Sequence, residues 1–481
     1  MGIWPDANEG LGPKSIDLNQ LMGVHSDGFA KPEIDLASKG GKFVKYDLPD
    51  AIMDSGGPYE IPIPSTGADY LDLTTARLYG ELKVVKIDGG AEKPCTAGDD
   101  FSLVNLPANS IFRQAELIVN GTGVADTSTS NYHYKAYLET QLSYGYDAKM
   151  TILQTAGYYK DVAGTCKRNA IQGGDTTSGY YLRSKLVEKS KVWEFGTSLH
   201  IDFLDCSKPL PPGVNMTLKL YRNNDKFVTI QNDDKEYKIK LLKLGVEFRK
   251  LDFMPAKVSR DLSMLESGEP YIMPFNKTHL TTRVIPTGIS SFSVPDLYRG
   301  PLPQQLIIGF VNHSAYNADP KLNPYIFENI GIKSLAFKVN GQSHPSTEYR
   351  PDFANNKCTR EYIHMHDALG VRRLNSGIGI TQDDFSKNNC FFVLDLSSDQ
   401  CNNARKYPIF KIYYIIVSFI VVLTKSSFIL LDTHLTHTGT IGLEISFATP
   451  TPDPFQIIEY GVFHTALVID KDRVCALVDN I

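Results

Sequence analysis

The motifs that usually identify an enzyme are missing from this chain of 481 residues. It has no G-x-S-x-G, no G-x-x-x-x-G-K-S/T, and no G-x-G-x-x-G after a strand-like run, so a serine nucleophile, a phosphate-binding loop and a dinucleotide site all lack candidates. We therefore predict that the protein is not an enzyme. We also predict no catalytic, cofactor-binding or metal-binding residues and no small-molecule substrate.

Cysteines at the spacing of a metal site or a disulfide framework are missing as well. The chain has 7 cysteines, widely scattered and without a C-x-x-C: Cys95, Cys166, Cys206, Cys358, Cys390, Cys401 and Cys475. No charged-then-apolar signal sequence opens the chain, because Pro5, Asp6 and Glu9 interrupt any apolar run. We expect reduced thiols and a protein that is not secreted.

An excess of positive charge is absent too. The net charge is -5 and the pI is near 6.1, whereas a protein that coats nucleic acid with its whole surface carries an excess of Lys and Arg. With 42% hydrophobic, 11% aromatic and 21% charged residues, the composition is that of a folded protein rather than of a disordered or fibrous one. The length fits two domains of roughly 200 to 250 residues each.

The pattern that is present is a series of short strand-like runs separated by turn residues. The clearest are 71–87, 110–119, 199–204, 214–221 and 237–251. One helical stripe, over residues 132–144, lies in a long connection between such runs. Many strands without regularly alternating helices predict antiparallel sandwiches, of which the jelly roll is the commonest large form. Residues 1–38 show no period and predict an N-terminal arm.

Four segments recur in the same order in the two halves of the chain. Residues 114–121 and 333–341 are both strand-like runs that end in Asn-Gly. The other similar pairs are 199–205 with 391–396, 215–220 with 440–445, and 239–252 with 457–470. This repetition predicts an all-β protein of two tandem antiparallel jelly-roll β-sandwiches, a double jelly roll with a few short helices in its connections. Residues 39–254 would form the first jelly roll and 255–481 the second.

An apolar segment at 404–432 has no counterpart in the first half. Leu204 and Leu218 are 14 positions apart, whereas Leu394 and Leu443 are 49 apart. The apolar stretch within it, 412–423, is shorter than the ~20 residues that a membrane-spanning helix needs. A buried hairpin or a surface tower inserted between strands is an alternative. We favour a foreign insert, in the form of a retained intron or a gene-model error. A sequence rich in Ile, Tyr, Phe, Lys and Leu is typical of translated A/T-rich DNA.

One pair of histidines offers a metal site. His364 and His366 stand at i and i+2, and on a strand they would point to the same face, as metal-binding histidines do in cupins, which are also jelly rolls. The Glu that a cupin has a few residues later is missing, since Gly370, Val371 and Arg372 stand there. A cupin-like metal-binding enzyme therefore remains only an alternative, and two ordinary histidines are the preferred interpretation.

A family resemblance is carried by short stretches that keep their order from residue 69 to residue 473. They are Asp69-Tyr70-Leu71-Asp72-Leu73, Ser102-Leu103-Val104-Asn105, 110–117, 131–140, Gly300-Pro301-Leu302-Pro303, Gly309-Phe310-Val311, 323–327, Arg360-Glu361-Tyr362, and Ile469-Asp470 with Arg473. Together they resemble the hexon-like, double jelly-roll major capsid protein of Polinton (Maverick) elements and of the related adintoviruses. The segment 404–432 departs from that pattern.

The resemblance implies a structural role in a viral shell. Three chains would form a pseudo-hexagonal homotrimeric capsomer, located in the virion capsid after synthesis in the host cytoplasm or nucleus. The implied partners are neighbouring capsomers, a penton or vertex minor capsid protein, and packaged DNA at the inner face. A vertex or receptor-binding protein with a single jelly roll is the other alternative.

Overall fold

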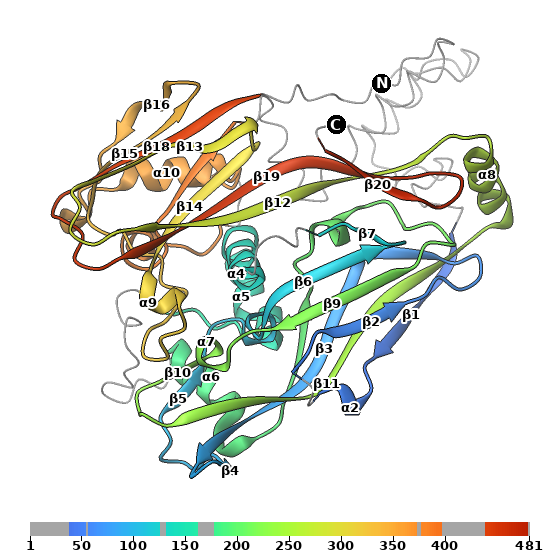
Figure 1. The fold of residues 1–481 in the computed structure, drawn as a ribbon, viewed down its shortest axis with the longest axis horizontal. Helices are drawn as coiled ribbons and strands as arrows, with labels where there is room; N and C mark the ends of the chain where they lie inside the picture. The colour runs from blue at the N-terminus through green and yellow to red at the C-terminus, as the bar shows by residue number, and fades with distance from the viewer. Residues whose placement is uncertain are drawn as a thin grey trace, which may run out of the picture.

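The computed structural model describes residues 38–53, 56–125, 131–161, 178–372, 377–396 and 438–479. Within these ranges the chain folds into β-sandwiches that lie side by side (Figure 1). The predicted arm at 1–38, except for Ser38, and the predicted insert at 404–432 lie outside the described residues.

The first sandwich consists of two antiparallel sheets. One has the order β1 (Ser38–Asp47), β11 (Glu236–Phe253), β3 (Tyr70–Asp88), with β4 (Ala91–Pro94) and β8 (Trp193–Ser198) both pairing with β3. The other has the order β2 (Tyr59–Ile63), β9 (Met216–Arg222), β6 (Phe112–Val119) and β7 (Thr122–Gly123). Side chains of β2 alternate strictly between buried and exposed, which is expected when one face of a sheet covers a core.

The second sandwich repeats this arrangement. One sheet has the order β12 (Tyr271–Ile285), β19 (Phe455–Ile469), β14 (Gln305–Asn312) and β17 (Phe391–Asp395), and β20 (Cys475–Asp479) also pairs with β19. The other has the order β13 (Ser291–Pro301), β18 (Thr438–Phe447), β15 (Ile332–Val339) and β16 (Gln342–Tyr349). A two-stranded sheet of β5 (Phe101–Leu103) and β10 (Thr229–Gln231) completes the strands in the described ranges.

Apart from β4, β5 and β10 in the first half and β20 in the second, the strands of the two sandwiches have the same connectivity. The order β1-β11-β3, with β8 on β3, corresponds to β12-β19-β14-β17, and the order β2-β9-β6-β7 corresponds to β13-β18-β15-β16. The strands β6 and β15 correspond, and both end in the predicted turn, where Asn120, Gly121, Asn340 and Gly341 all have positive φ. The predicted double jelly roll is confirmed.

One of the four proposed sequence pairs is wrong. Residues 391–396 do form a strand, β17, but residues 199–204 do not, because the chain turns there into the short helix η3 (Asp202–Asp205). The strand that corresponds to β17 is β8, which pairs with β3 as β17 pairs with β14. The reason is that Ile201, Phe203 and Leu204 are all buried. A short apolar run is typical of a buried strand but also of a buried turn of helix.

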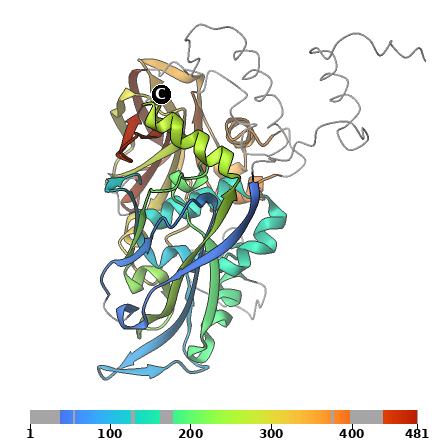
Figure 2. The same ribbon diagram turned by 90° about the vertical axis from the view of Figure 1, so that its right-hand side faces the viewer.

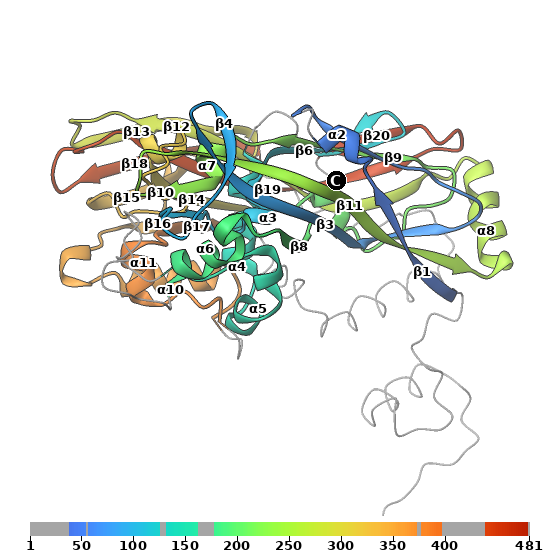
Figure 3. The same ribbon diagram turned by 90° about the horizontal axis from the view of Figure 1, so that it is seen from below.

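Helices lie in the connections. Those of the first sandwich are α2 (Asp50–Met53), α3 (Pro107–Ser110), α4 (Tyr132–Ser143), α5 (Tyr146–Met150), η1 (Ile152–Ala156), α6 (Gly179–Val187), η2 (Glu188–Ser190) and α7 (Asp225–Val228). The others are α8 (Pro255–Glu266), which joins the sandwiches, α9 (His313–Tyr316), η4 (Phe353–Asn355), α10 (Thr359–Ala368) and α11 (Gln382–Lys387). The helix predicted at 132–144 is confirmed as α4. Helices α4, α5, α6, α10 and α11 gather on one side of the sheets (Figure 3).

Candidate functional site

The contact region between the two sandwiches, which we call the seam, is centred on helix α4. The Tyr137 ring stacks on Tyr325, which belongs to the connection between α9 and β15, with ring centroids 4.3 Å apart. The Tyr134 hydroxyl donates to the Pro324 carbonyl oxygen at 3.2 Å. Burying such large rings in offset stacks removes much apolar area from water and fixes their orientation. The aromatic part of the seam therefore holds the two sandwiches together.

Charged groups cross the seam beside these rings. Asp202 of η3 forms a salt bridge with Lys135 of α4 at 2.7 Å. Its carboxylate also accepts hydrogen bonds from the backbone N–H and the hydroxyl of Thr278, on β12, both at 2.9 Å. The Asp202 side chain is 6% exposed and that of Lys135 is 15% exposed. Burial opposes the charge on Lys135, but Asp202 and Glu139 raise its pKa above the ordinary value. The buried pair is satisfied from both sandwiches.

Glu139, one helical turn after Lys135, extends this network. Its carboxylate lies 2.7 Å from His200 Nδ1 and accepts a hydrogen bond from the Tyr460 hydroxyl, on β19, at 2.8 Å. Although burial opposes ionisation, Lys135 and His200 hold the pKa of Glu139 at about 2. Glu139 is therefore an anion that contacts β19 directly.

A second set of contacts joins helix-bearing connections of the two sandwiches. The buried Lys149 ammonium donates to the backbone oxygen of Gln141 at 2.7 Å and to that of Ile378 at 2.6 Å, and burial lowers the pKa of Lys149 to about 7. Lys160 forms a salt bridge with Asp384 at 2.7 Å. Asp384 also completes a capping box with Thr381 at the start of α11. These contacts fix the connections of the two sandwiches to each other.

Another part of the seam is held by hydrogen bonds from side chains of the first sandwich to backbone oxygens of the second. Asn120 donates its side-chain amide to the Arg473 carbonyl oxygen at 3.0 Å, and the Thr122 hydroxyl donates to the Cys475 carbonyl oxygen at 2.7 Å. The β6–β7 hairpin thus contacts the β19–β20 turn, which is a second place where the two sandwiches touch.

The sequence did not identify the seam residues as a group. A signal existed, because Lys135 and Glu139 are spaced by four in the predicted helix and are 3.9 Å apart in the structure. Their partners Asp202, Thr278 and Tyr460 come from distant parts of the chain, and no spacing relates them. Only the fold brings these groups together.

The interpretation of His364 and His366 as metal ligands on a strand is wrong. Both lie on helix α10, where residues two apart point roughly 200° away from each other. His364 Nδ1 lies 3.2 Å from the Tyr349 hydroxyl and His366 Nδ1 lies 2.9 Å from the Tyr362 carbonyl oxygen. Among the residues that the structure describes, no group of three or more His, Cys, Asp or Glu could hold a metal ion. The geometry gives no support to a cupin-like site.

The cysteines in the described ranges are buried free thiols: Cys95, Cys206, Cys358, Cys390 and Cys475. Burial raises their pKa values, in the case of Cys475 to about 11. Such thiols are poor nucleophiles because little thiolate forms at neutral pH. Cys166 and Cys401 lie outside the described residues.

No helix in the described part of the chain has the length and apolar character needed to cross a membrane. The apolar stretch 412–423 lies outside the described residues, so its interpretation stays a prediction.

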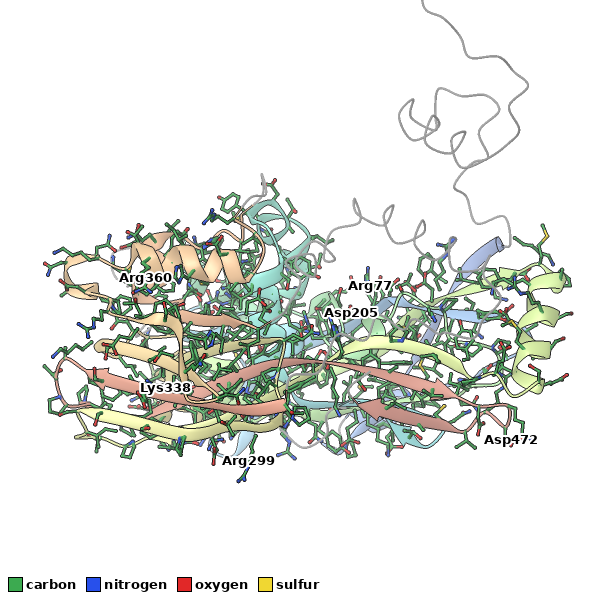
Figure 4. The ribbon with its side chains drawn as sticks, turned by 90° about the horizontal axis from the view of Figure 1, so that it is seen from above. Arg77, Asp205, Arg299, Lys338, Arg360 and Asp472 are labelled. Atoms are coloured by element: carbon green, nitrogen blue, oxygen red, sulfur yellow. The ribbon has the colours of Figure 1, made fainter. Side chains whose placement is uncertain are left out.

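Charged side chains are distributed around the outside of the molecule rather than gathered in one place. Arg299 of β13, Arg360 of α10 and Asp472 of the β19–β20 turn lie at its periphery (Figure 4). On the outer face of the first sandwich, Lys243 pairs with Glu81 at 2.8 Å. This mixture of both signs is typical of a solvated surface.

The class that this architecture defines is the double jelly roll, in which one chain carries two jelly-roll sandwiches with equal connectivity. Known structures confirm the fold. One is a chain of the Sputnik virophage structure determined by cryo-EM, with a TM-score of 0.59, 10% identity and coverage of 94% of this chain and 92% of that chain.

Two further structures extend the comparison. The Faustovirus major capsid protein has a TM-score of 0.51 and 10% identity, and the alignment covers 96% of this chain and 95% of that one. A chain of the PBCV-1 virus capsid has a TM-score of 0.51 and 9% identity, with 94% and 100% covered. The fold implied by the capsid-protein resemblance is therefore present over nearly the whole chain.

Similarity at the level of sequence covers a smaller part of the chain. The Caenorhabditis elegans protein named "Uncharacterized protein F54H12.2" is 24% identical over 326 residues, which are 66% of this chain and 74% of that protein. No protein-family model matches the chain.

Proposed function

We propose that this protein is a structural major capsid protein that forms pseudo-hexagonal, homotrimeric capsomers of a Polinton-like viral shell. The observation that supports this most strongly is the duplication: β1, β11, β3 and β8 recur as β12, β19, β14 and β17, and the opposite sheets recur as well. One chain thus offers two similar walls that stand side by side.

A geometric argument supports the proposed trimer. Closed rings are the common outcome when identical chains meet through heterologous contacts, and three chains with two sandwiches each supply six similar walls. A hexagonal outline built from three copies tiles a shell, whereas a single jelly roll would need five or six separate chains. The alternative of a single-jelly-roll vertex or receptor-binding protein does not agree with the two sandwiches observed.

The seam supports this function by making each chain rigid. Aromatic stacking at Tyr137 and Tyr325, the hydrogen bonds from Thr278 to Asp202 and the Lys149 contact with Ile378 all join the two sandwiches. A capsomer keeps its outline only if the two walls of each chain keep their angle, and a buried, fully paired polar network gives that kind of specificity.

The remaining parts of the proposal concern organisation and partners. We place the boundary between the jelly rolls at residues 254 and 255, where β11 ends and α8 begins, with residues 1–38 as an arm and 404–432 as a foreign insert. The proposed partners are the chain itself, neighbouring capsomers, a penton or vertex minor capsid protein, and packaged DNA at the inner face. The proposed location is the virion capsid. The proposal includes no enzymatic activity, cofactor or small-molecule substrate.

The test is the mass and shape of the recombinant protein in solution. Size exclusion with light scattering should give a species of three times 53.5 kDa, and electron microscopy should show particles with a hexagonal outline. A monomer at all concentrations, or a pentamer, would contradict the proposal.

A further inference from the structure

Helix α8 exposes apolar side chains at the end of the molecule where the two sandwiches are joined. Of its side chains only Leu265 is buried, and Leu262 and Met264 are 37% and 40% exposed. The helix is attached along one edge: the Lys257 ammonium lies 4.5 Å from the Phe253 ring centroid, and Asp261 accepts a hydrogen bond from the Tyr70 hydroxyl at 2.8 Å. These two side chains therefore lie on the side of the helix that faces Tyr70 and Phe253.

A groove of about 610 Å³ lies beside the helix on this same side, since Lys257, Asp261 and the buried Leu265 are part of its lining. Its apolar lining comes from Ala256, Met264, Leu265, Pro270 and Tyr271. Its charged lining comes from Arg260, Glu269 and the pair Lys257–Asp261, whose charged groups are 2.7 Å apart. Grooves of this size with an apolar floor and a few charged groups are typical binding sites for short segments of chain. Leu262, on the same helix, is not part of the groove.

The chain itself brings a segment to this groove. Ser38, the first residue of β1, pairs with Phe253 of β11, and the next residue, Met254, is the N-cap of α8. Figure 2 shows the start of β1 (blue) at one end of α8 (yellow-green). Ser38, to which the preceding segment is joined, is therefore paired with a residue next to the N-terminus of α8. Since α8 is about 18 Å long at 1.5 Å per residue, six or seven residues in extended form span its length.

The sequence immediately before Ser38 has a matching pattern. It reads Lys31-Pro32-Glu33-Ile34-Asp35-Leu36-Ala37, so apolar Ile34 and Leu36 alternate with acidic Glu33 and Asp35. Alternation of this kind places the apolar side chains on one side of an extended segment and the carboxylates on the other. Such a segment is stabilised by an apolar surface, and its carboxylates complement the Arg260 guanidinium.

We infer that residues 31–37 dock in the groove beside α8 of the same chain, with Ile34 and Leu36 against Met264 and Tyr271 and with the acidic side chains near Arg260. The docked segment covers the apolar edge of α8 and extends the first sandwich toward the second. This assignment does not depend on the proposed capsid function.

Hydrogen exchange on the full chain tests the inference. Amides of 31–37 should exchange about tenfold more slowly than those of a free peptide, since docking must open before exchange. Met264→Asp should abolish that protection, because it places a carboxylate on the groove floor. Leu262→Asp is the matched control on the same helix and should leave it unchanged. The β1–β11 amides, measured in the same experiment, show that each variant is folded.

A charge reversal adds a second readout. Arg260→Glu should weaken the protection of 31–37, and Asp35→Arg in the same chain should restore it. Free-peptide exchange at 31–37 in the wild-type chain would overturn the inference, and so would equal effects of Met264→Asp and Leu262→Asp. Loss of protection on hundredfold dilution would show that the segment binds a neighbouring chain, which would overturn the assignment to the same chain.

Discussion

Single charged residues at the seam show how the sandwiches are fixed to each other. Asp202 and Asp47 both pair with a lysine, at 2.7 Å from Lys135 and at 2.9 Å from Lys45, but the Asp202 side chain is 6% exposed and the Asp47 side chain is 60% exposed. An exposed pair competes with water and contributes little, whereas a buried charge that loses its partner is costly.

Replacing Asp202 should therefore destabilise the protein. Asp202→Asn leaves the buried Lys135 without its closest carboxylate and should lower the free energy of unfolding by roughly 3 kcal/mol, as measured by urea denaturation. The control Asp47→Asn should change it by less than about 0.5 kcal/mol. Equal effects of the two substitutions would show that the buried ion pair contributes no more to stability than the exposed one.

The buried His133 predicts a pH dependence. Its ring lies 4.4 Å from that of Phe227 on α7, and burial lowers its pKa from 6.5 to about 3. Between these two values the unfolded chain binds a proton that the folded chain does not, so stability falls as the pH falls from 6.5 toward 3, by about 1.4 kcal/mol per pH unit at most.

This dependence can be isolated by substitution. His133→Phe keeps an aromatic ring beside Phe227 and removes the titrating group, so urea denaturation between pH 4 and 7 should show a shallower loss of stability than in the wild type. His366→Phe, at a half-buried position on α10, serves as the control and should follow the wild-type curve. Parallel curves for His133→Phe and the wild type would contradict the prediction, because they would mean that His133 has the same pKa in the folded and the unfolded chain.

At the scale of elements, close packing of strands sets the constraints. Gly80 of β3 lies against β8 and β11, and a Cβ built there would be 2.4 Å from the Phe195 ring and 2.8 Å from the Lys243 carbonyl oxygen. Backbone cannot yield as a flexible side chain can. The sheet of the first sandwich therefore needs glycine where these three strands meet.

Gly80→Ala should disturb this packing. We expect a loss of about 1–3 kcal/mol in the free energy of unfolding, measured by thermal or urea denaturation. Gly98→Ala is the matched control, since a Cβ there meets nothing within 4 Å, and it should stay within about 0.5 kcal/mol of the wild type. A neutral Gly80→Ala would show that β8 can move away from β3.

Elements also show how far the sequence alone leads. The Asn-Gly turns after β6 and β15, the helix α4 and the two-copy architecture could be predicted, because each depends on a local pattern. The short helix η3 at Asp202–Asp205 and the helical state of His364 and His366 could not be predicted, because short apolar or polar runs do not distinguish a strand from a turn of helix. The seam could not be predicted either, since its partners meet only after both sandwiches have formed.

At the scale of the whole molecule, the length of the connection between β17 and β18 leads to a prediction about assembly. Its counterpart between β8 and β9 spans residues 199–215, while the β17–β18 connection spans residues 396–437. If 404–432 is a foreign insert, the fold does not need it. Deletion of residues 405–432 should leave the unfolding midpoint unchanged or raised and should increase the trimer fraction in light scattering. Loss of soluble protein on deletion would contradict this prediction.

The unequal helices of the two sandwiches have a consequence for the proposed capsomer. The first sandwich carries α4, α5 and α6 in its long connection, and the second carries α10 and α11 in the corresponding place. Around the proposed ring, sandwiches with similar strands but different helices would alternate. The outline would therefore have six sides, while the surface chemistry would have only threefold symmetry. A ligand that recognises one decoration would bind each capsomer three times, and two adjacent capsomers could dock in only half of the orientations that their outlines allow.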